Sequence, residues 1–178
     1  MKKLNSLAIT FWGMARLEAL YEHFAKYKFA YLAVLLGYWL FFTRYDLSLN
    51  VSNSLSGTLY LVEKRVLPSR NDYAVFLYPS DFIYHKNSRF LKRVIGVAGD
   101  IVESKNHQFS VNGKSVGAAL PVTSQGFQIV ENDFHGVIPI GYYYMMGDHP
   151  NSLDSRYKVV GLVPAPMVIG RGIRLFKS

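Results

Sequence analysis

The spacing of apolar residues divides this chain of 178 residues into two parts. Over residues 1–28, apolar positions recur at roughly helical spacing among basic side chains. Residues 29–43, FAYLAVLLGYWLFFT, carry no charged side chain. From about residue 47 onward, short apolar segments alternate with Gly, Pro, Asn and Asp, as strands and turns do. The pattern predicts a helical N-terminal part followed by a mainly β domain at residues 47–178.

The first segment, residues 1–28, has more Lys and Arg than Glu. A helix with one apolar and one basic face is typical of proteins that lie on a membrane surface. We therefore expect a basic amphipathic segment on the cytoplasmic side of a membrane. A soluble helix packed on the β domain is the alternative.

The uncharged run at residues 29–43 predicts a transmembrane anchor. A single-pass helix needs about 20 apolar residues, with a lower limit near 17, and the run reaches that limit if Tyr27 and a snorkelling Lys28 are included. A cleavable signal peptide fits less well. Such a peptide has a short charged lead and a cleavage site with small residues, whereas here the lead is 28 residues long and no such site follows in TRYDLSLN. The excess of Lys and Arg before the run places the N-terminus in the cytoplasm and the chain after Arg44 outside it.

The β domain is predicted from segments rich in β-branched and aromatic residues. The clearest of these segments are residues 73–78, 89–97, 108–116, 141–146 and 168–176. Asn112-Gly113 divides one of them and is a strong signal for a two-residue hairpin turn.

Composition then limits the chemistry. The chain has no cysteine, which excludes a thiolate nucleophile, a disulfide and a zinc–thiolate site. Its five histidines are scattered without ligand spacing, so we expect no metal and no cofactor. The net charge of +8 favours phospholipid or nucleic acid. Because the basic residues concentrate before the apolar run and form no stripe with aromatics, we expect no nucleic-acid partner.

Lys92 and Arg93 are adjacent in the predicted strand at residues 89–97, so their side chains point to opposite faces. Each has apolar neighbours on its own face, and at least one cation should therefore meet apolar surroundings. A buried lysine tends to lose its proton and can then act as a general base. The alternative is an edge strand with both charged groups in water.

Three serines, Ser52, Ser54 and Ser56, lie shortly after the apolar run. A serine hydroxyl attacks well only when a base takes its proton, and a lysine can be that base. Ser54 is the candidate nucleophile. In an extended segment Ser52 projects to the same side, where its hydroxyl could stabilise an oxyanion. A solvated turn is the alternative.

The segment MMGDHPNSLDSRYKVVGLVP, residues 145–164, combines hydroxyl, carboxylate and guanidinium groups within a turn. Ser152 is a candidate for orienting the lysine. Asp154 and Arg156 are candidates for a supporting ion pair. A turn held by hydrogen bonds and this ion pair, without catalytic meaning, is the alternative.

In this order, the segments resemble the bacterial type I signal peptidases, the serine–lysine family S26, and most closely the conjugative-transfer peptidases of the TraF type. The resemblance covers about residues 50–176. It rests on SNSLSGTLY, RNDYAVF, FLKRVIGVAGD, the V-N-G-K hairpin and MMGDHPNSLDSR.

The resemblance implies a role for each matching residue. Ser54 falls at the nucleophile and Lys92 at the general base. Ser52 falls at the oxyanion hydroxyl, Ser152 at the residue bonded to the lysine, and a structural pair falls at Asp154 and Arg156.

The resemblance also implies a single N-terminal transmembrane helix followed by a compact, β-barrel-like catalytic domain. The protein would reside in the bacterial inner membrane with its catalytic domain periplasmic or otherwise extracytoplasmic. Its partners would be membrane-inserted precursors such as pilins, membrane phospholipid and conjugative secretion machinery.

Three alternatives remain open at this point. Ser56 could replace Ser54 as the nucleophile if the register of the first motif shifts. The chain could be a non-enzymatic, membrane-anchored component of a secretion or pilus assembly. A self-cleaving repressor-type relative fits least, because residues 1–45 are too apolar for a DNA-reading module.

Overall fold

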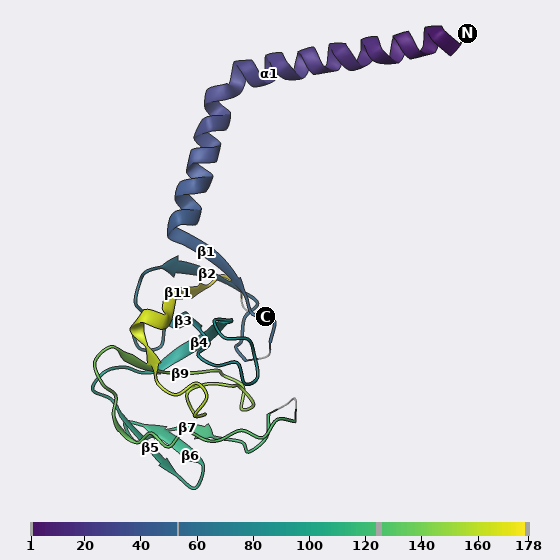
Figure 1. The fold of residues 1–178 in the computed structure, drawn as a ribbon. Helices are drawn as coiled ribbons and strands as arrows, with labels where there is room; N and C mark the ends of the chain where they lie inside the picture. The colour runs from purple at the N-terminus through teal and green to yellow at the C-terminus, as the bar shows by residue number, and fades with distance from the viewer. Residues whose placement is uncertain (1, 53, 124–125, 177–178) are drawn as a thin grey trace. The chain divides into compact units, whose positions relative to one another are not determined.

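The computed structural model describes residues 2–52, 54–123 and 126–176, in two compact units that comprise residues 1–43 and 44–178. A single helix, α1, runs from Lys2 to Arg44 (Figure 1). The side chains of residues 1–13 and 15 lie outside the described part. The amphipathic interpretation of the first segment therefore stays a prediction.

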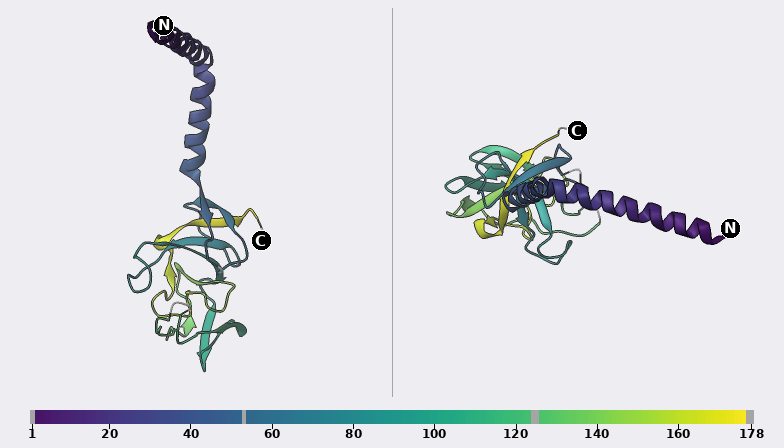
Figure 2. Two further views of the ribbon diagram at one scale, coloured as in Figure 1. Left: turned by 90° about the vertical axis from the view of Figure 1, so that its right-hand side faces the viewer. Right: turned by 90° about the horizontal axis from the view of Figure 1, so that it is seen from above.

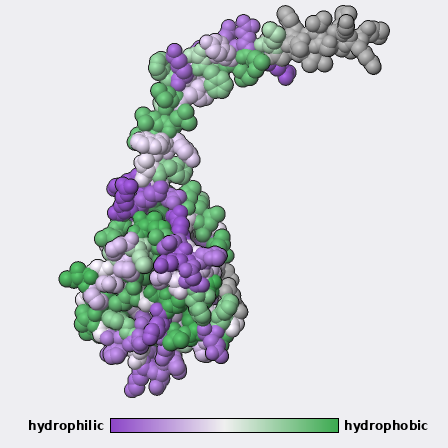
Figure 3. Space-filling model, viewed as in Figure 1, coloured by the Kyte–Doolittle hydropathy of each residue, from purple (hydrophilic) through white to green (hydrophobic). Residues whose placement is uncertain are grey.

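The predicted transmembrane helix at residues 29–43 is not supported. Among the described residues, no helix combines the length and the apolar character that crossing a bilayer requires. The uncharged run is shorter than the about 20 residues of a typical span. Any longer window takes in Lys28 or Arg44. Figure 3 accordingly shows hydrophobic and hydrophilic residues mixed along the described part of α1.

The second unit is mainly β, as predicted, and its larger sheet has seven antiparallel strands in the order β1-β2-β11-β3-β4-β9-β10. Its strands are β1 (Tyr45–Leu49), β2 (Leu59–Lys64), β3 (Tyr73–Leu77), β4 (Arg89–Gly96), β9 (Tyr142–Met146), β10 (Val163–Pro164) and β11 (Val168–Arg174). A short 3₁₀ helix, η1 (Ala165–Met167), leads into β11.

The second sheet has four antiparallel strands in the order β7-β6-β5-β8. These are β5 (Ile101–Lys105), β6 (Gln108–Val111), β7 (Lys114–Ala118) and β8 (Gly136–Val137). Figure 1 and the left view of Figure 2 show this sheet at the opposite end of the unit from β1 and β2. Asn112 and Gly113 both have positive φ between β6 and β7, which confirms the predicted hairpin.

The barrel-like closure expected for the domain is wrong. β1 and β10 end the larger sheet without pairing to each other, and among the described strands both sheets are open. The other predicted strand segments correspond to β3, β4, β9 and β11, each within a few residues. The segments of β1, β2, β5, β8 and β10 were not among the strands singled out from the sequence.

β4 lies inside the larger sheet, between β3 and β9, and separates two apolar clusters. Val94 packs on one face with Ala74, Phe76, Tyr78 and Met145. Leu91 packs on the other with Leu55, Tyr60, Val62 and Val75. Lys92 shares the face of Val94, and Arg93 shares the face of Leu91. The alternation of β4 therefore sends its two cations to different environments.

Gly170 in β11 marks where the sheet tolerates no side chain. A Cβ at this position would lie 2.1 Å from the backbone oxygen of Glu63. We expect Gly170→Ala to lower the free energy of unfolding by about 1–3 kcal/mol or more, because neighbouring backbone must move. Urea unfolding followed by near-ultraviolet circular dichroism measures this loss. Gly37→Ala, where a Cβ meets open space within a helix, should cost no stability, and an equal loss in both variants would contradict the steric account.

Candidate active site

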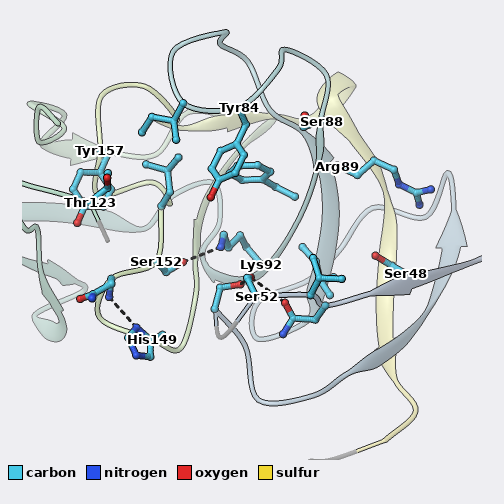
Figure 4. Close-up of a pocket in the computed structure, with 18 of the residues that line it drawn as sticks. Ser48, Ser52, Tyr84, Ser88, Arg89, Lys92, Thr123, His149, Ser152 and Tyr157 are labelled. Carbon is cyan, nitrogen blue, oxygen red and sulfur yellow. Dashed lines mark hydrogen bonds between the residues drawn. The ribbon is translucent and has the colours of Figure 1, made fainter. Parts of the chain in front are cut away.

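A pocket of about 750 Å³ collects the polar residues singled out from the sequence. It lies between the segment that follows β1, strand β4 and the loop after β9 (Figure 4). Ser52, Ser54, Lys92 and Ser152 all line it. Figure 4 shows Ser52, Lys92 and Ser152 meeting in the middle of the pocket. Residues far apart in sequence are therefore brought to one cavity.

Lys92 is the buried cation that the strand pattern predicted, since its relative exposure is 5%. Its Nζ donates a hydrogen bond to Ser152 Oγ at 2.8 Å and lies 5.6 Å from the centre of the Phe90 ring. Burial, helped by the positive charge of Arg156, lowers the pKa of Lys92 from an ordinary 10.5 to about 8, against the opposing charges of Asp154 and Asp148. A large fraction of this amine is therefore neutral at mildly alkaline pH.

Arg93 lies on the opposite face of β4 from Lys92. Its side chain is 42% exposed and forms an ion pair with Asp148 at 3.2 Å. The interpretation that both cations of β4 reach water is therefore wrong for Lys92 and holds only for Arg93.

Ser54 Oγ lies 2.9 Å from Ser52 Oγ, and Ser52 Oγ donates to Asn50 Oδ1 at 3.2 Å. Because the Ser52 proton is directed to Asn50, the Ser54 hydroxyl is the donor to Ser52. Within the described part of the chain, no hydrogen bond joins Ser54 Oγ directly to Lys92 Nζ. The pairing of Ser54 with Lys92 therefore stays a prediction, made between two groups that line one pocket.

Asn50 is a site residue that the sequence analysis missed. Its amide Nδ2 donates to the carbonyl oxygens of Leu55 and Gly57, at 2.9 and 3.0 Å. It therefore holds both sides of the loop that carries Ser54. Its position next to the serine cluster was a weak signal, since Asn is common in solvated turns.

The loop after β9 fixes the backbone of Ser54. The amides of Asp148 and His149 donate to the Ser54 carbonyl at 2.6 and 3.3 Å. Gly147 makes this approach possible, because a Cβ there would lie 2.1 Å from Ser152 Oγ and 2.7 Å from the Ser54 carbonyl oxygen. The serine loop and the Ser152 loop thus form one contact region.

Asp154 and Arg156 form the ion pair expected from the sequence, with relative exposures of 0% and 2%. Arg156 donates to both carboxylate oxygens of Asp154 at 2.9 Å. Arg156 also donates to the carbonyls of Pro150 and Ser152, while Asp154 accepts from the Gly147 amide. This pair holds the loop that presents Ser152 to Lys92.

Ser56, the alternative nucleophile, faces different partners. Its hydroxyl lies 3.3 Å from Asp148 Oδ2 and 3.2 Å from a terminal nitrogen of Arg174. It lines a second pocket, and Lys92 is not among the residues of that pocket. The geometry therefore favours Ser54 over Ser56.

Comparison with known proteins gives a family. The family model described as "Signal peptidase, peptidase S26" matches residues 21–176. Signal peptidase I of Pseudomonas fluorescens is 29% identical over 158 residues, which cover 67% of this chain and 54% of that protein. Signal peptidase I of Pseudomonas aeruginosa is 31% identical over 145 residues, which cover 62% and 50%. The chain spans about half the length of these relatives.

A solved structure of a signal peptidase I from Enterococcus faecalis is 28% identical to this chain. The match covers 59% of this chain and 96% of that one, with a TM-score of 0.39.

The buried amine predicts a pH-dependent stability. Between pH 8 and 10.5 the unfolded chain keeps the Lys92 proton that the folded chain has lost, so the free energy of unfolding should rise with pH by about 3 kcal/mol in total. Below pH 8 both states hold the proton and this rise is absent. Urea unfolding across this range should therefore show the free energy of unfolding of the wild type increasing by this amount relative to that of Lys92→Met, which shares every other titrating group.

The exposed Lys105 supplies the control, since Lys105→Met should keep the rise of the wild type. Parallel curves for the wild type and Lys92→Met would show that the amine is hydrated in the folded protein.

Proposed function

The chain belongs to the signal peptidase family, peptidase S26, and we propose that it is a serine endopeptidase that cleaves signal peptides from exported precursor proteins by a Ser54–Lys92 dyad. The observation that carries this proposal is the buried amine of Lys92, held by Ser152 in the pocket that Ser54 lines. A neutral lysine beside a serine supplies both parts of nucleophilic catalysis, a base and a hydroxyl.

In the first step, Ser54 Oγ attacks the carbonyl carbon of the scissile peptide bond while neutral Lys92 takes the hydroxyl proton. The Ser54 hydroxyl contacts Ser52 in the structure, so this step requires it to turn from Ser52 toward Lys92. The lysine then gives its proton to the departing amine, which leaves an ester between Ser54 and the signal peptide. Lys92 next activates a water molecule that hydrolyses the ester and restores the hydroxyl.

Ser152 and Ser52 assist this sequence in different ways. Ser152 Oγ accepts one hydrogen of the Lys92 amine and so directs the nitrogen lone pair. Ser52 lies 2.9 Å from the attacking oxygen and can donate its proton to the negative oxygen of the intermediate. Asp154 and Arg156 act at a distance by holding the Ser152 loop.

We propose the conjugative branch of the family as the more specific assignment, with membrane-inserted pilin-type precursors as substrates and conjugative secretion machinery as the partner. Its support is the resemblance of the sequence motifs. The site would be the outer face of the bacterial inner membrane, among its phospholipids. The exposed apolar side chains of α1 support contact with lipid, among them Leu32, Val34, Leu35 and Leu36.

The dyad is tested by single substitutions in the full-length protein. Ser54→Ala and Lys92→Ala should each reduce precursor cleavage by about 10³-fold or more, because each removes one half of the nucleophilic step. Gel assays of a precursor measure the loss, and circular dichroism verifies folding. Ser56→Ala is the matched control and should keep activity near that of the wild type. Processing at the wild-type rate by either dyad variant would rule out the mechanism.

The pH profile tests the base. Because only neutral Lys92 accepts a proton, kcat/KM should rise about tenfold per pH unit below pH 8 and level off above it. Initial rates on one precursor peptide between pH 6 and 10 measure the curve. A flat profile from pH 6 to 9 would mean that Lys92 is not the base.

A further inference from the structure

A second pocket, of about 1020 Å³, opens on the other side of the loop that carries Ser54. Its lining includes four basic side chains, Arg70, Arg93, Lys114 and Arg174, with Ser56 and Asp148 at the edge nearest the active site. Arg93 faces it because the alternation of β4 turns this side chain away from Lys92. Lys114 comes from the second sheet. Figure 3 shows hydrophilic residues gathered at the end of the unit that carries this sheet.

The positive charge of this pocket is only partly neutralised. Arg70 is paired with Asp100, and one terminal nitrogen of Arg93 with Asp148. The Nε of Arg93 is buried, and within the described residues it has no hydrogen-bond partner.

Two further cations have no carboxylate partner. Arg174 donates to the carbonyl and hydroxyl of Ser56 and to the Tyr73 hydroxyl, which are all uncharged groups. Lys114 is exposed and forms no ion pair with any residue that the structure describes. Both cations would attract a carboxylate that enters the pocket, while Asp148 at its edge would repel it.

The two pockets differ in a way that orients a peptide. The active-site pocket has many apolar lining residues, among them Leu49, Val51, Phe90 and Leu153. A signal peptide is apolar on the amino side of its cleavage site, so this side suits the active-site pocket. The chain after the scissile bond must then leave Ser54 in another direction, and the basic pocket begins two residues further along the same loop, at Ser56.

We propose that the basic pocket binds an acidic side chain of the precursor, two to four residues after the scissile bond. This inference rests on the proposed function and names a further specificity of the same site. Two residues of extended substrate chain span about 7 Å, so a side chain two to four residues after the scissile bond can reach past Ser54 toward Arg174, which contacts the same loop at Ser56. Arg174 and Lys114 are the specificity-determining residues.

The first test uses the full-length protein and three peptides that carry Asp, Asn or Lys at the third position after the cleaved bond. An ion pair at a partly exposed site should make kcat/KM about three- to tenfold higher for Asp than for Asn, mainly through KM. The Lys peptide should have the lowest kcat/KM, and 0.5 M salt should reduce the differences between the three peptides.

Substitution of the pocket then reverses the preference. Lys114→Glu should cut the Lys peptide faster than the Asp peptide, while Lys105→Glu, an exposed change of equal charge outside the pocket, should keep the wild-type order. Arg174→Gln should reduce the preference for Asp without reversing it. Equal cleavage of all three peptides by the wild type would overturn the inference and leave the proposed protease intact.

A binding measurement separates the pocket from the chemistry. Fluorescence anisotropy with Ser54→Ala should show the same order of affinities, and the added Lys114→Glu change should reverse it. If this order of affinities is found but the wild type cleaves none of the peptides, the result would support binding of an acidic side chain by the basic pocket and contradict the proposed function.

Anionic lipid is the competing ligand for the same cations. If Lys114→Glu weakens binding to phosphatidylglycerol vesicles relative to phosphatidylcholine, and leaves the peptide order unchanged, the pocket serves a lipid headgroup and the inference is wrong.

Discussion

The site depends on the cost of enclosing one ammonium group within an apolar strand face. Lys92 lies on the face of β4 that also carries Val94, beside Met145 of β9, and it has little access to water. A charge in such surroundings is stabilised only by nearby polar groups. Ser152 supplies a hydrogen bond but no counter-charge, and the nearby Asp154 is already neutralised by Arg156. The amine therefore has a neighbour that orients it and none that fixes its charge.

The loops around this amine are irregular, and hydrogen bonds give them their shape. Asn50 joins both sides of the serine loop, and the Ser54 carbonyl accepts from the loop after β9. Between Ser54 and Ser56, the side chain of Leu55 packs into a buried apolar cluster. The absence of a side chain at Gly147 lets the two loops meet. A site made in this way is sensitive to changes that leave the sheets unaltered.

Local rules predicted part of this arrangement from the sequence. Strand alternation separated Lys92 from Arg93, and the hairpin at Asn112-Gly113 followed from the φ angles its turn requires. The contacts of Asn50 and the second pocket could not be predicted, because they depend on loops that meet only after the sheets form. The transmembrane helix predicted at residues 29–43 finds no support among the described residues, since this run lies at the lower limit of span length and charged residues flank it.

The order of the two cations in β4 also carries meaning. A guanidinium does not give up its proton in a protein, whereas an ammonium does so when enclosed. Exchanging Lys92 and Arg93 would keep the composition, the net charge and the strand. It would nevertheless place a permanent cation in the pocket that Ser54 lines and a titratable one beside Asp148. The order of these two residues therefore decides whether the buried group can lose its proton, and the net charge of the chain does not reveal that order.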